Sequence, residues 1–158
     1  MPSGKADSIV ILRAARLAEL AELSLLCLRS KAVWDYSPEV IAACRAELTL
    51  GPGDLETTRV AERRGHPVGV VQVTVGGRTA SLDRIFVEPH DIGTGVGTIL
   101  FAEARTMARD AGAKELVVIA DPGAAGFFIR MGARPAGEVP SGSVPGLVLP
   151  RFALALPG

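Results

Sequence analysis

Cysteine and histidine are scarce in this sequence of 158 residues, which contains two of each. Cys27 and Cys44 are not clustered and fall in segments with helical patterns, so neither a disulfide framework nor a zinc site is expected. His66 and His90 have no partners at the spacing of metal ligands, and we predict no metal site. The two thiols are therefore expected to be reduced and buried.

The chain also lacks an excess of either charge, since 17 Lys and Arg residues balance 17 Asp and Glu residues. Without a basic surface, neither nucleic acid nor an acidic membrane is expected as a partner. No apolar run reaches the length of a membrane span, and residues 1–7 lack the apolar segment of a signal peptide. These absences predict a cytoplasmic protein, and the length predicts a single domain over residues 1–158.

The hydrophobic pattern predicts a mixture of strands and helices. Apolar or alternating runs predict strands at 9–12, 57–63, 68–75, 79–87, 116–120 and 151–156. Helical spacing predicts helices from 17 to about 30, from 38 to 48, from about 96 to 112 and from about 123 to 131. Residues 140–150 are rich in Pro, Gly and Ser and are expected to form a surface loop beside the site.

The most informative segment is a glycine-rich turn within residues 87–98. A predicted strand ends at Val87, and Gly93, Gly95 and Gly97 lead directly into an amphipathic segment. The first turn of a helix has unpaired N–H groups and a partial positive charge, both of which suit phosphate. No lysine follows as in a Walker loop, and the third glycine of a dinucleotide fingerprint is missing. Taken alone, the turn is also compatible with a connection that binds nothing.

The order of the elements and two motifs together resemble the GCN5-related N-acetyltransferase (GNAT) superfamily. Ile92-Gly93-Thr94-Gly95-Val96-Gly97 is similar to the family's pyrophosphate loop, Q/R-x-x-G-x-G/A. Residues 121–132 are similar to its later motif, N-x-x-A-x-x-L/F-Y-x-x-x-G, and the resemblance covers nearly the whole chain. It implies an α/β fold of the α+β type. A mostly antiparallel central sheet, with parallel fourth and fifth strands that splay apart, is flanked by helices.

The resemblance also implies an activity and a set of binding residues. The chain would transfer an acetyl group from acetyl-CoA to a primary amine of a small molecule or peptide, by direct attack in a ternary complex. A backbone N–H near Val87 would polarise the thioester carbonyl. The cofactor-binding residues implied are Phe86, Val87, Ile92, Gly93, Thr94, Gly95, Val96, Gly97, Thr98, Asp121, Phe127 and Phe128.

Members of this family often dimerise. The apolar strand at 152–156 is expected to lie at a sheet edge, where it could pair in a homodimer.

Three residues depart from the family pattern. Ile92 stands where Gln or Arg is usual, which removes one side-chain contact to the pyrophosphate. Asp121 replaces Asn and, when ionised, accepts hydrogen bonds without donating them. Phe128 replaces the tyrosine proposed as general acid, so a second interpretation is a weakly active or inactive CoA-binding sensor or interaction domain. A third, a generic nucleotide-binding α/β protein, would leave the later motif a coincidence.

Four residues are candidates for catalysis and substrate binding. Asp83 is the first candidate for the general base, because it lies on the strand leading to the cofactor, although it could equally face solvent or pair with a neighbour. Glu88 is the second candidate, with a solvated strand end as the alternative. Trp34 and Tyr36, the only Trp and Tyr, are predicted to bind the acceptor between the first two helices. The alternative for Trp34 is that its side chain only fills the junction between these two helices.

Overall fold

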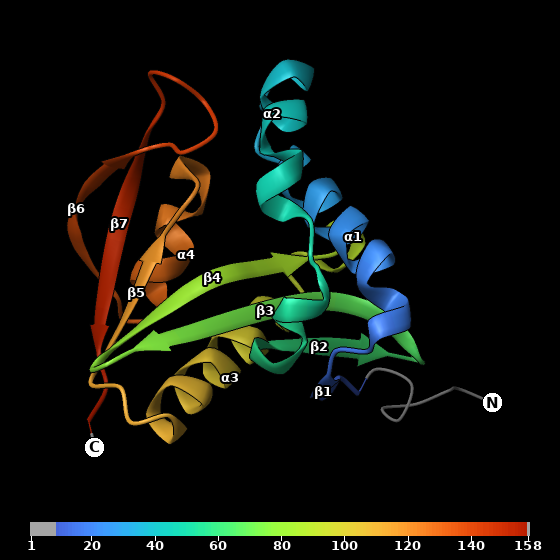
Figure 1. Cartoon of the computed structure of the whole chain (residues 1–158), viewed down its shortest axis with the longest axis horizontal. Helices are drawn as coiled ribbons and strands as arrows, with labels where there is room; N and C mark the ends of the chain where they lie inside the picture. The colour runs from blue at the N-terminus through green and yellow to red at the C-terminus, as the bar shows by residue number, and fades with distance from the viewer. Residues whose placement is uncertain (1–8, 158) are drawn as a thin grey trace.

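The computed structural model describes residues 9–157, which form a mixed seven-stranded sheet with helices on both faces (Figure 1). The strand order is β1-β2-β3-β4-β5-β7-β6, and only β4 and β5 are parallel neighbours. The strands are β1 (Ile11–Ala14), β2 (Thr58–Arg63), β3 (His66–Gly76), β4 (Thr79–Val87), β5 (Glu115–Ile119), β6 (Arg134–Pro140) and β7 (Val148–Ala155). This architecture confirms the predicted fold class.

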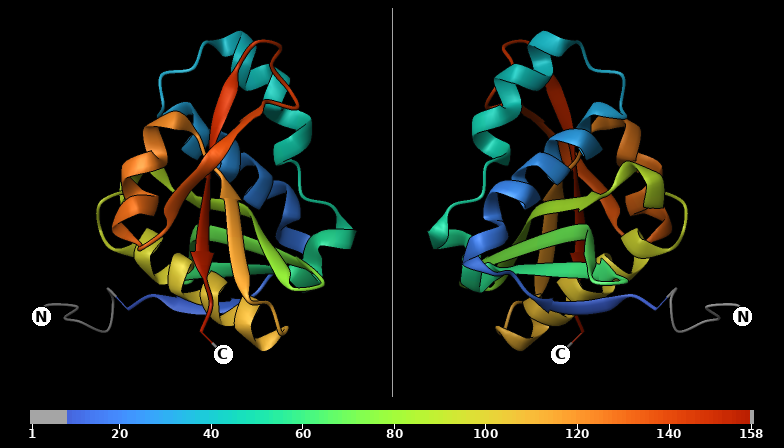
Figure 2. Two further views of the ribbon diagram at one scale, coloured as in Figure 1. Left: turned by 90° about the vertical axis from the view of Figure 1, so that its left-hand side faces the viewer. Right: turned by 90° about the vertical axis from the view of Figure 1, so that its right-hand side faces the viewer.

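The helices divide between the two faces of the sheet (Figures 1 and 2). One face carries α1 (Leu20–Ala32) and α2 (Pro38–Leu48), and the other carries α3 (Val96–Asp110). The short helix α4 (Ala125–Arg130) packs through Phe128 into the core beneath α3. Short 3-10 helices are η2 (Leu17–Glu19), η3 (Pro52–Thr57), η4 (Pro89–Asp91) and η5 (Pro122–Ala124).

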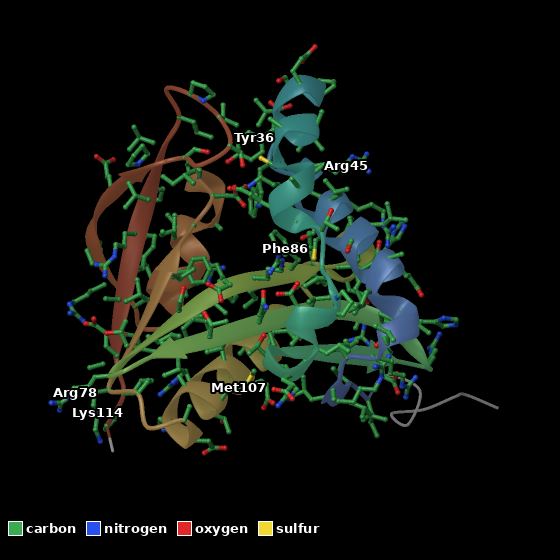
Figure 3. All side chains as sticks on the ribbon, in the orientation of Figure 1. Tyr36, Arg45, Arg78, Phe86, Met107 and Lys114 are labelled. Atoms are coloured by element: carbon green, nitrogen blue, oxygen red, sulfur yellow. The ribbon has the colours of Figure 1, made fainter. Side chains whose placement is uncertain are left out.

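Each face of the sheet has its own hydrophobic core, and β3 supplies both. Val70 packs with Leu23 and Leu26 of α1, whereas Val71 packs with Leu100 of α3, and all five are almost completely buried. Adjacent strand residues point to opposite faces, so a strand covered on both sides needs a continuous apolar run. The sequence supplies such a run around Val70. Figure 3 shows Phe86 on the side of the sheet that faces α1 and α2.

The parallel strands β4 and β5 pair over a short stretch and then separate. Their register runs from Thr79 opposite Glu115 to Leu82 opposite Val118. The β3–β4 register shifts at this point, and Asp83 is the extra residue of a β-bulge. Beyond it β5 continues to pair with β7 while β4 turns away, as Figure 1 shows. The result is the predicted splay between the two strands.

Two expectations about the C-terminal third were wrong. The sequence pattern did not predict β6, because Pro135 and Gly137 read as loop residues; β6 is an edge strand, where proline is tolerated. As a consequence β7 lies between β5 and β6, so the apolar residues 152–156 do not form an edge. Within the described residues the edges are β1 and β6. The first strand also begins at Ile11, two residues later than predicted.

Candidate functional site

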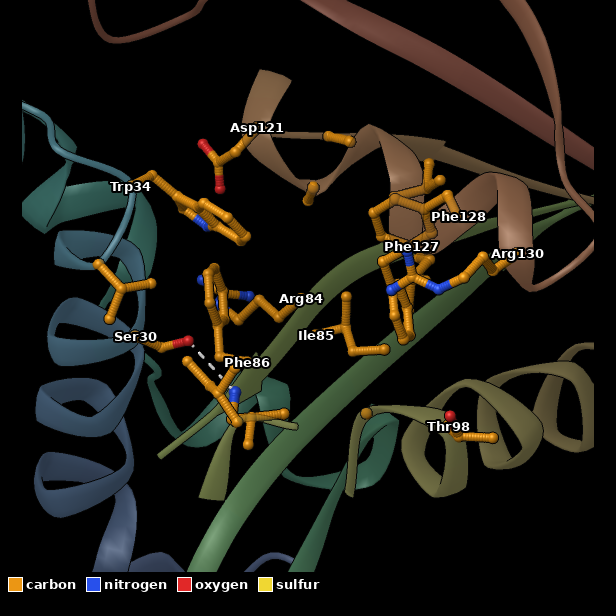
Figure 4. Close-up of a pocket in the computed structure, with 18 of the residues that line it drawn as sticks. Ser30, Trp34, Arg84, Ile85, Phe86, Thr98, Asp121, Phe127, Phe128 and Arg130 are labelled. Carbon is orange, nitrogen blue, oxygen red and sulfur yellow. Dashed lines mark hydrogen bonds between the residues drawn. The ribbon is translucent and has the colours of Figure 1, made fainter. Parts of the chain in front are cut away.

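A cavity of about 450 Å³ occupies the gap between β4 and β5 (Figure 4). It is lined by residues from the end of α1, from β4, from the glycine turn, and from the segment that joins β5 to α4. The predicted site residues that line it are Trp34, Asp83, Phe86, Val87, Ile92, Gly93, Gly95, Gly97, Thr98, Asp121, Phe127 and Phe128. Four predicted site residues do not line the cavity: Thr94, Val96, Tyr36 and Glu88. Three polar residues that were not predicted do line it: Ser30, Arg84 and Arg130.

The glycine turn presents a helix N-terminus to the mouth of this cavity. Gly93 and Gly95 have φ angles of 84° and 95°, which side chains rarely tolerate, and Gly95 is the N-cap of α3. Among the described residues no side chain caps the first turn of α3. Thr94 instead bonds locally, its hydroxyl donating to the Asp91 carbonyl at 2.6 Å. The unpaired N–H groups and the dipole of α3 therefore favour an anion here.

The acidic residues beside this turn are neutralised by arginines from other elements. Glu88 accepts two hydrogen bonds from Arg29 of α1, at 2.9 and 2.7 Å. Asp91 forms an ion pair with Arg63 at the end of β2. These pairs offset negative charge that would otherwise weaken anion binding at α3. The Glu88 carboxylate is therefore bound to Arg29 of α1, and Glu88 does not line the cavity.

Arg130 brings a positive charge to the cavity from α4. Its side chain is exposed, and Nη1 lies 3.5 Å from where a Cβ on Gly126 would be, so the guanidinium folds back along α4. Figure 4 shows it beside Phe127. Ile92, which is half exposed on the glycine turn, offers no charge. The cation that the loop lacks is therefore available from a different element.

The backbone of β4 leaves donors and acceptors facing the gap. Glu88 donates its N–H to the Val68 carbonyl at 2.8 Å, so by strand alternation the amides of Ile85 and Val87 point away from β3. On the other side, Ala120 donates to Pro150 of β7, which turns the Ile119 amide toward β4. Two half-ladders, meaning rows of backbone N–H and C=O groups on β4 and β5, thus face each other across the gap without hydrogen-bonding to one another. The Val87 N–H donates to Ser30 Oγ at 3.2 Å, and an extended ligand with its own amides would pair with the groups that remain.

Asp83 lies at the bulge and borders the cavity. Its carboxylate accepts hydrogen bonds from the Thr74 hydroxyl at 2.6 Å and the Ser81 hydroxyl at 2.8 Å, and it is exposed. Arg84 does not pair with it. The Arg84 guanidinium instead donates to the Gln72 side chain and, at 2.5 Å, to the Glu47 carbonyl at the end of α2. Asp83 is thus oriented by two neutral donors.

Asp121 lines the cavity and belongs to a cluster with Lys31 and Tyr36. The Asp121 carboxylate accepts from Lys31 Nζ at 2.7 Å and from the Tyr36 hydroxyl at 2.8 Å. Burial and the nearby Asp121 carboxylate raise the pKa of Tyr36. This cluster joins the loop after α1 to the turn after β5.

Trp34 makes a second contact between the loop after α1 and the turn after β5. Its indole packs on Gly123, where an added Cβ would come within 2.5 Å of Cε3. The ring is 39% exposed and also lines the cavity, so it both fills the junction and forms a wall.

Neither Phe128 nor the two cysteines supplies a reactive group to the cavity. Phe128 is buried in an aromatic cluster with Phe101, Phe127 and Phe152, and brings no hydroxyl to the cavity. Burial raises the pKa of the Cys27 thiol to about 12 and also raises the pKa of Cys44. Neither cysteine is therefore a thiolate nucleophile near neutral pH.

Residues 36–141 match the family model described as acetyltransferase (GNAT) domain. Similar solved structures include a GCN5-related N-acetyltransferase from Rhodopseudomonas palustris, 25% identical with a TM-score of 0.77, where the match covers 92% of this chain and 95% of that one. The PaiA N-acetyltransferase from Thermoplasma acidophilum, in complex with coenzyme A, is 16% identical with a TM-score of 0.77, covering 93% and 99%. A GNAT family acetyltransferase from Brucella melitensis, in complex with acetyl-CoA, is 24% identical with a TM-score of 0.64, covering 95% and 90%.

No curated protein matches the sequence. Among residues 9–157, no helix is long and apolar enough to cross a membrane. Within the same residues, no group of three or more His, Cys, Asp or Glu side chains is arranged to hold a metal ion.

Proposed function

Since the chain belongs to the acetyltransferase (GNAT) domain family, whose members are acetyl-CoA-dependent N-acetyltransferases, we propose that it acetylates a primary amine of a small molecule or peptide. The observation that carries this proposal is the single cavity that runs from the N-terminus of α3, along the separated strands, to Asp83. It offers an anion site, unpaired backbone and a carboxylate in one continuous space.

The parts of acetyl-CoA fit this space in order. The pyrophosphate would accept hydrogen bonds from the first-turn N–H groups of α3, with Gly95 and Gly97 allowing close approach and Arg130 adding charge. The pantetheine arm contains two amides, which suit the half-ladders of β4 and β5. The complexes of the Thermoplasma acidophilum and Brucella melitensis proteins with coenzyme A and acetyl-CoA support this assignment.

Asp83 is the proposed general base. The attacking amine must be neutral, and Asp83 would take its proton directly or through water in the cavity. The Thr74 and Ser81 hydroxyls hold the carboxylate in place. Trp34 would form one wall for the acceptor, since an indole ring accommodates apolar and cationic groups alike. Glu88 is less suited to this role, because its two oxygens accept from Arg29.

A second candidate function is a CoA-binding sensor or interaction domain with little turnover. The observation that favours it is Phe128, which is buried where related enzymes carry a tyrosine proposed as general acid. Acetyl transfer does not strictly need this acid, because a CoA thiol is a reasonable leaving group. Turnover therefore has to be measured separately from binding.

The first test is calorimetric titration of the protein with acetyl-CoA, repeated with Thr98→Glu. Thr98 is exposed in the first turn of α3 and lines the cavity, so a carboxylate there repels phosphate while remaining compatible with the helix dipole. We expect the Kd to rise at least about tenfold. Thr106→Glu, on the same helix outside this cavity, is the matched control and should leave the Kd unchanged.

Absence of binding to the wild type would contradict both candidate functions. If binding holds, release of CoA thiol is followed across a panel of amines. Turnover with any amine supports the acetyltransferase, whereas tight binding without turnover across the panel supports the sensor domain.

A further inference from the structure

We propose that the Ser30 hydroxyl is the hydrogen-bond donor that stabilises the thioester oxygen during acetyl transfer, and that Val87 acts through it. This inference rests on the proposed function. Ser30 lies in the last turn of α1, is 6% exposed and lines the cavity. Its Oγ accepts a hydrogen bond from the Val87 N–H at 3.2 Å, the bond drawn in Figure 4.

The hydroxyl hydrogen of Ser30 is the group available to a ligand. A serine hydroxyl donates one hydrogen bond and accepts two. Ser24, on the same helix, uses both functions within the protein: it donates to the Leu20 carbonyl at 2.7 Å and accepts from the Leu50 N–H at 2.8 Å. For Ser30 the only side-chain bond within residues 9–157 is the one it accepts from Val87. Its own hydrogen has no acceptor among these residues, and the side chain lines the cavity, so the hydrogen is available to a ligand there.

The position of Ser30 places this hydrogen between the β4 backbone and the ligand. The Val87 N–H points into the gap, where the thioester is expected, but it is already engaged by Ser30 Oγ. A carbonyl oxygen arriving there meets the hydroxyl rather than the amide. Donation from Val87 polarises the Ser30 O–H, because linked hydrogen bonds strengthen one another in a site of low dielectric. A fixed donor aimed at developing negative charge is an effective stabiliser of a transition state.

The chemistry balances with Ser30 keeping its proton throughout. The amine nitrogen forms a bond to the acetyl carbon, and the carbonyl oxygen gains negative charge that the Ser30 hydroxyl stabilises. The C–S bond then breaks, the oxygen regains its double bond, and the thiolate of CoA takes a proton from solvent. The amine proton passes through water to Asp83, four residues before Val87 on β4. The arrangement lowers the barrier to attack on the acetyl carbon, and protonation of the thiolate by solvent removes the need for an acid at the position of Phe128.

The test compares Ser30→Ala with Ser24→Ala, a matched change at an equally buried serine of α1 that does not line the cavity. CoA has no thioester oxygen, so Ser30→Ala should bind CoA as the wild type does and lose affinity for acetyl-CoA relative to CoA. Its kcat should fall about 10²-fold, the typical effect of losing one such donor. Ser24→Ala should change the melting temperature but neither the affinity ratio nor kcat.

Two further measurements keep the inference falsifiable if Ser30→Ala folds poorly. Ser30→Thr retains the hydroxyl and should retain most of kcat. In the wild type, the infrared band of acetyl-CoA carrying a ¹³C carbonyl should move to lower frequency on binding, since a hydrogen bond weakens the C=O bond. A kcat for Ser30→Ala equal to or above the wild type would overturn the inference and leave the Val87 N–H as the donor. Absence of the infrared movement would overturn it as well, because it would show that no donor bonds the thioester oxygen. Failure of the wild type to bind acetyl-CoA would instead overturn the proposed function.

Discussion

Single side chains that the two sequence motifs did not identify line the cavity. Ile92 brings no charge to the glycine turn, and Arg130 of α4 faces the same cavity. Ser30 of α1 lines the cavity and is bonded to Val87 of β4, although the motif around Phe128 gave no indication of it. Both residues are brought to the cavity by the fold from elements other than the glycine turn. At the scale of the residue, function is therefore tested best by single substitutions with a matched control nearby.

Replacing Arg130 by Gln should weaken CoA binding. Removing one cation from an anion site raises Kd by about tenfold, and the dependence of Kd on salt should become shallower because one charged contact is lost. Titration at two salt concentrations measures both. Arg109→Gln, at the exposed end of α3 and outside the cavity, is the control. Equal Kd values for the two variants would contradict the role of Arg130.

Replacing Asp83 by Asn should slow turnover without weakening CoA binding. Asn has the same shape and can still accept from Thr74 or Ser81, but it cannot take a proton from the amine. Loss of a general base lowers kcat by about 10²-fold or more. Steady-state kinetics and a CoA titration report the two effects separately. Asp110→Asn, at the end of α3, should match the wild type in both, and an unchanged kcat for Asp83→Asn would exclude it as the base.

Contacts between elements connect the two sides of the gap near Asp121. Lys31 and Tyr36 come from α1 and the loop after it, and Asp121 follows β5, so a single carboxylate joins the two sides of the gap. Trp34 and Gly123 make a second contact across the same boundary. A second connection lies on the face of the sheet that carries α2, where hydrogen bonds among Asp54, Gln72 and Arg84 link η3, β3 and β4. Stability changes are therefore expected when either connection is broken.

Replacing Asp121 by Asn should destabilise the fold. Lys31 is largely buried and would lose its only carboxylate partner among the described residues, which costs about 2 kcal/mol for a pair that retains some solvent contact. Tyr36→Phe removes one neutral donor from the same cluster and should cost about 1 kcal/mol. Urea denaturation measures both values. A stability for Asp121→Asn equal to that of the wild type would show that the cluster does not hold the two sides together.

Acid should weaken the connection made by Asp54. The Gly51 N–H and the Gln72 amide donate to its carboxylate and lower the pKa of Asp54 in the folded state. A lowered folded-state pKa means that the stabilisation is complete above the unfolded value of about 3.9 and is lost as pH falls through the folded value. The advantage of the wild type over Asp54→Asn should thus be constant at pH 6–7 and shrink below about pH 4. A difference independent of pH would contradict this assignment.

Across the whole molecule, local patterns predicted more of the fold than of the site. The glycine turn, α3 and the apolar strands follow from residues close together in sequence, and these were predicted correctly. β6 was missed because Pro135 and Gly137 carry no strand signal, and its existence depends on pairing with β7. Ser30 could not be identified from sequence because its partner, Val87, lies 57 residues away. Arg130 gave only the weak signal of an arginine two residues after Phe128.

Binding of acetyl-CoA should stabilise the entire fold. A ligand at 100 times its Kd adds about 2.7 kcal/mol, which corresponds to a rise in Tm of roughly 5–10 °C for a domain of this size. Scanning fluorimetry with increasing acetyl-CoA measures the effect. Thr106→Glu should show the same rise and Thr98→Glu a much smaller one at equal ligand concentration. Equal rises in both variants would place the ligand elsewhere.

The short pairing of β4 with β5 has a mechanical consequence. Strands β1–β4 form one plate and β5–β7 another, and the sheet connects them over four residue pairs, from Thr79 with Glu115 to Leu82 with Val118. Such a seam resists sliding along the strands better than it resists a change of angle between the plates. Asp83 and Val87 belong to one plate, and Asp121 and Phe127 follow the other. The angle at this seam therefore sets the width available to both substrates at once, so residues remote from either one can tune how they meet.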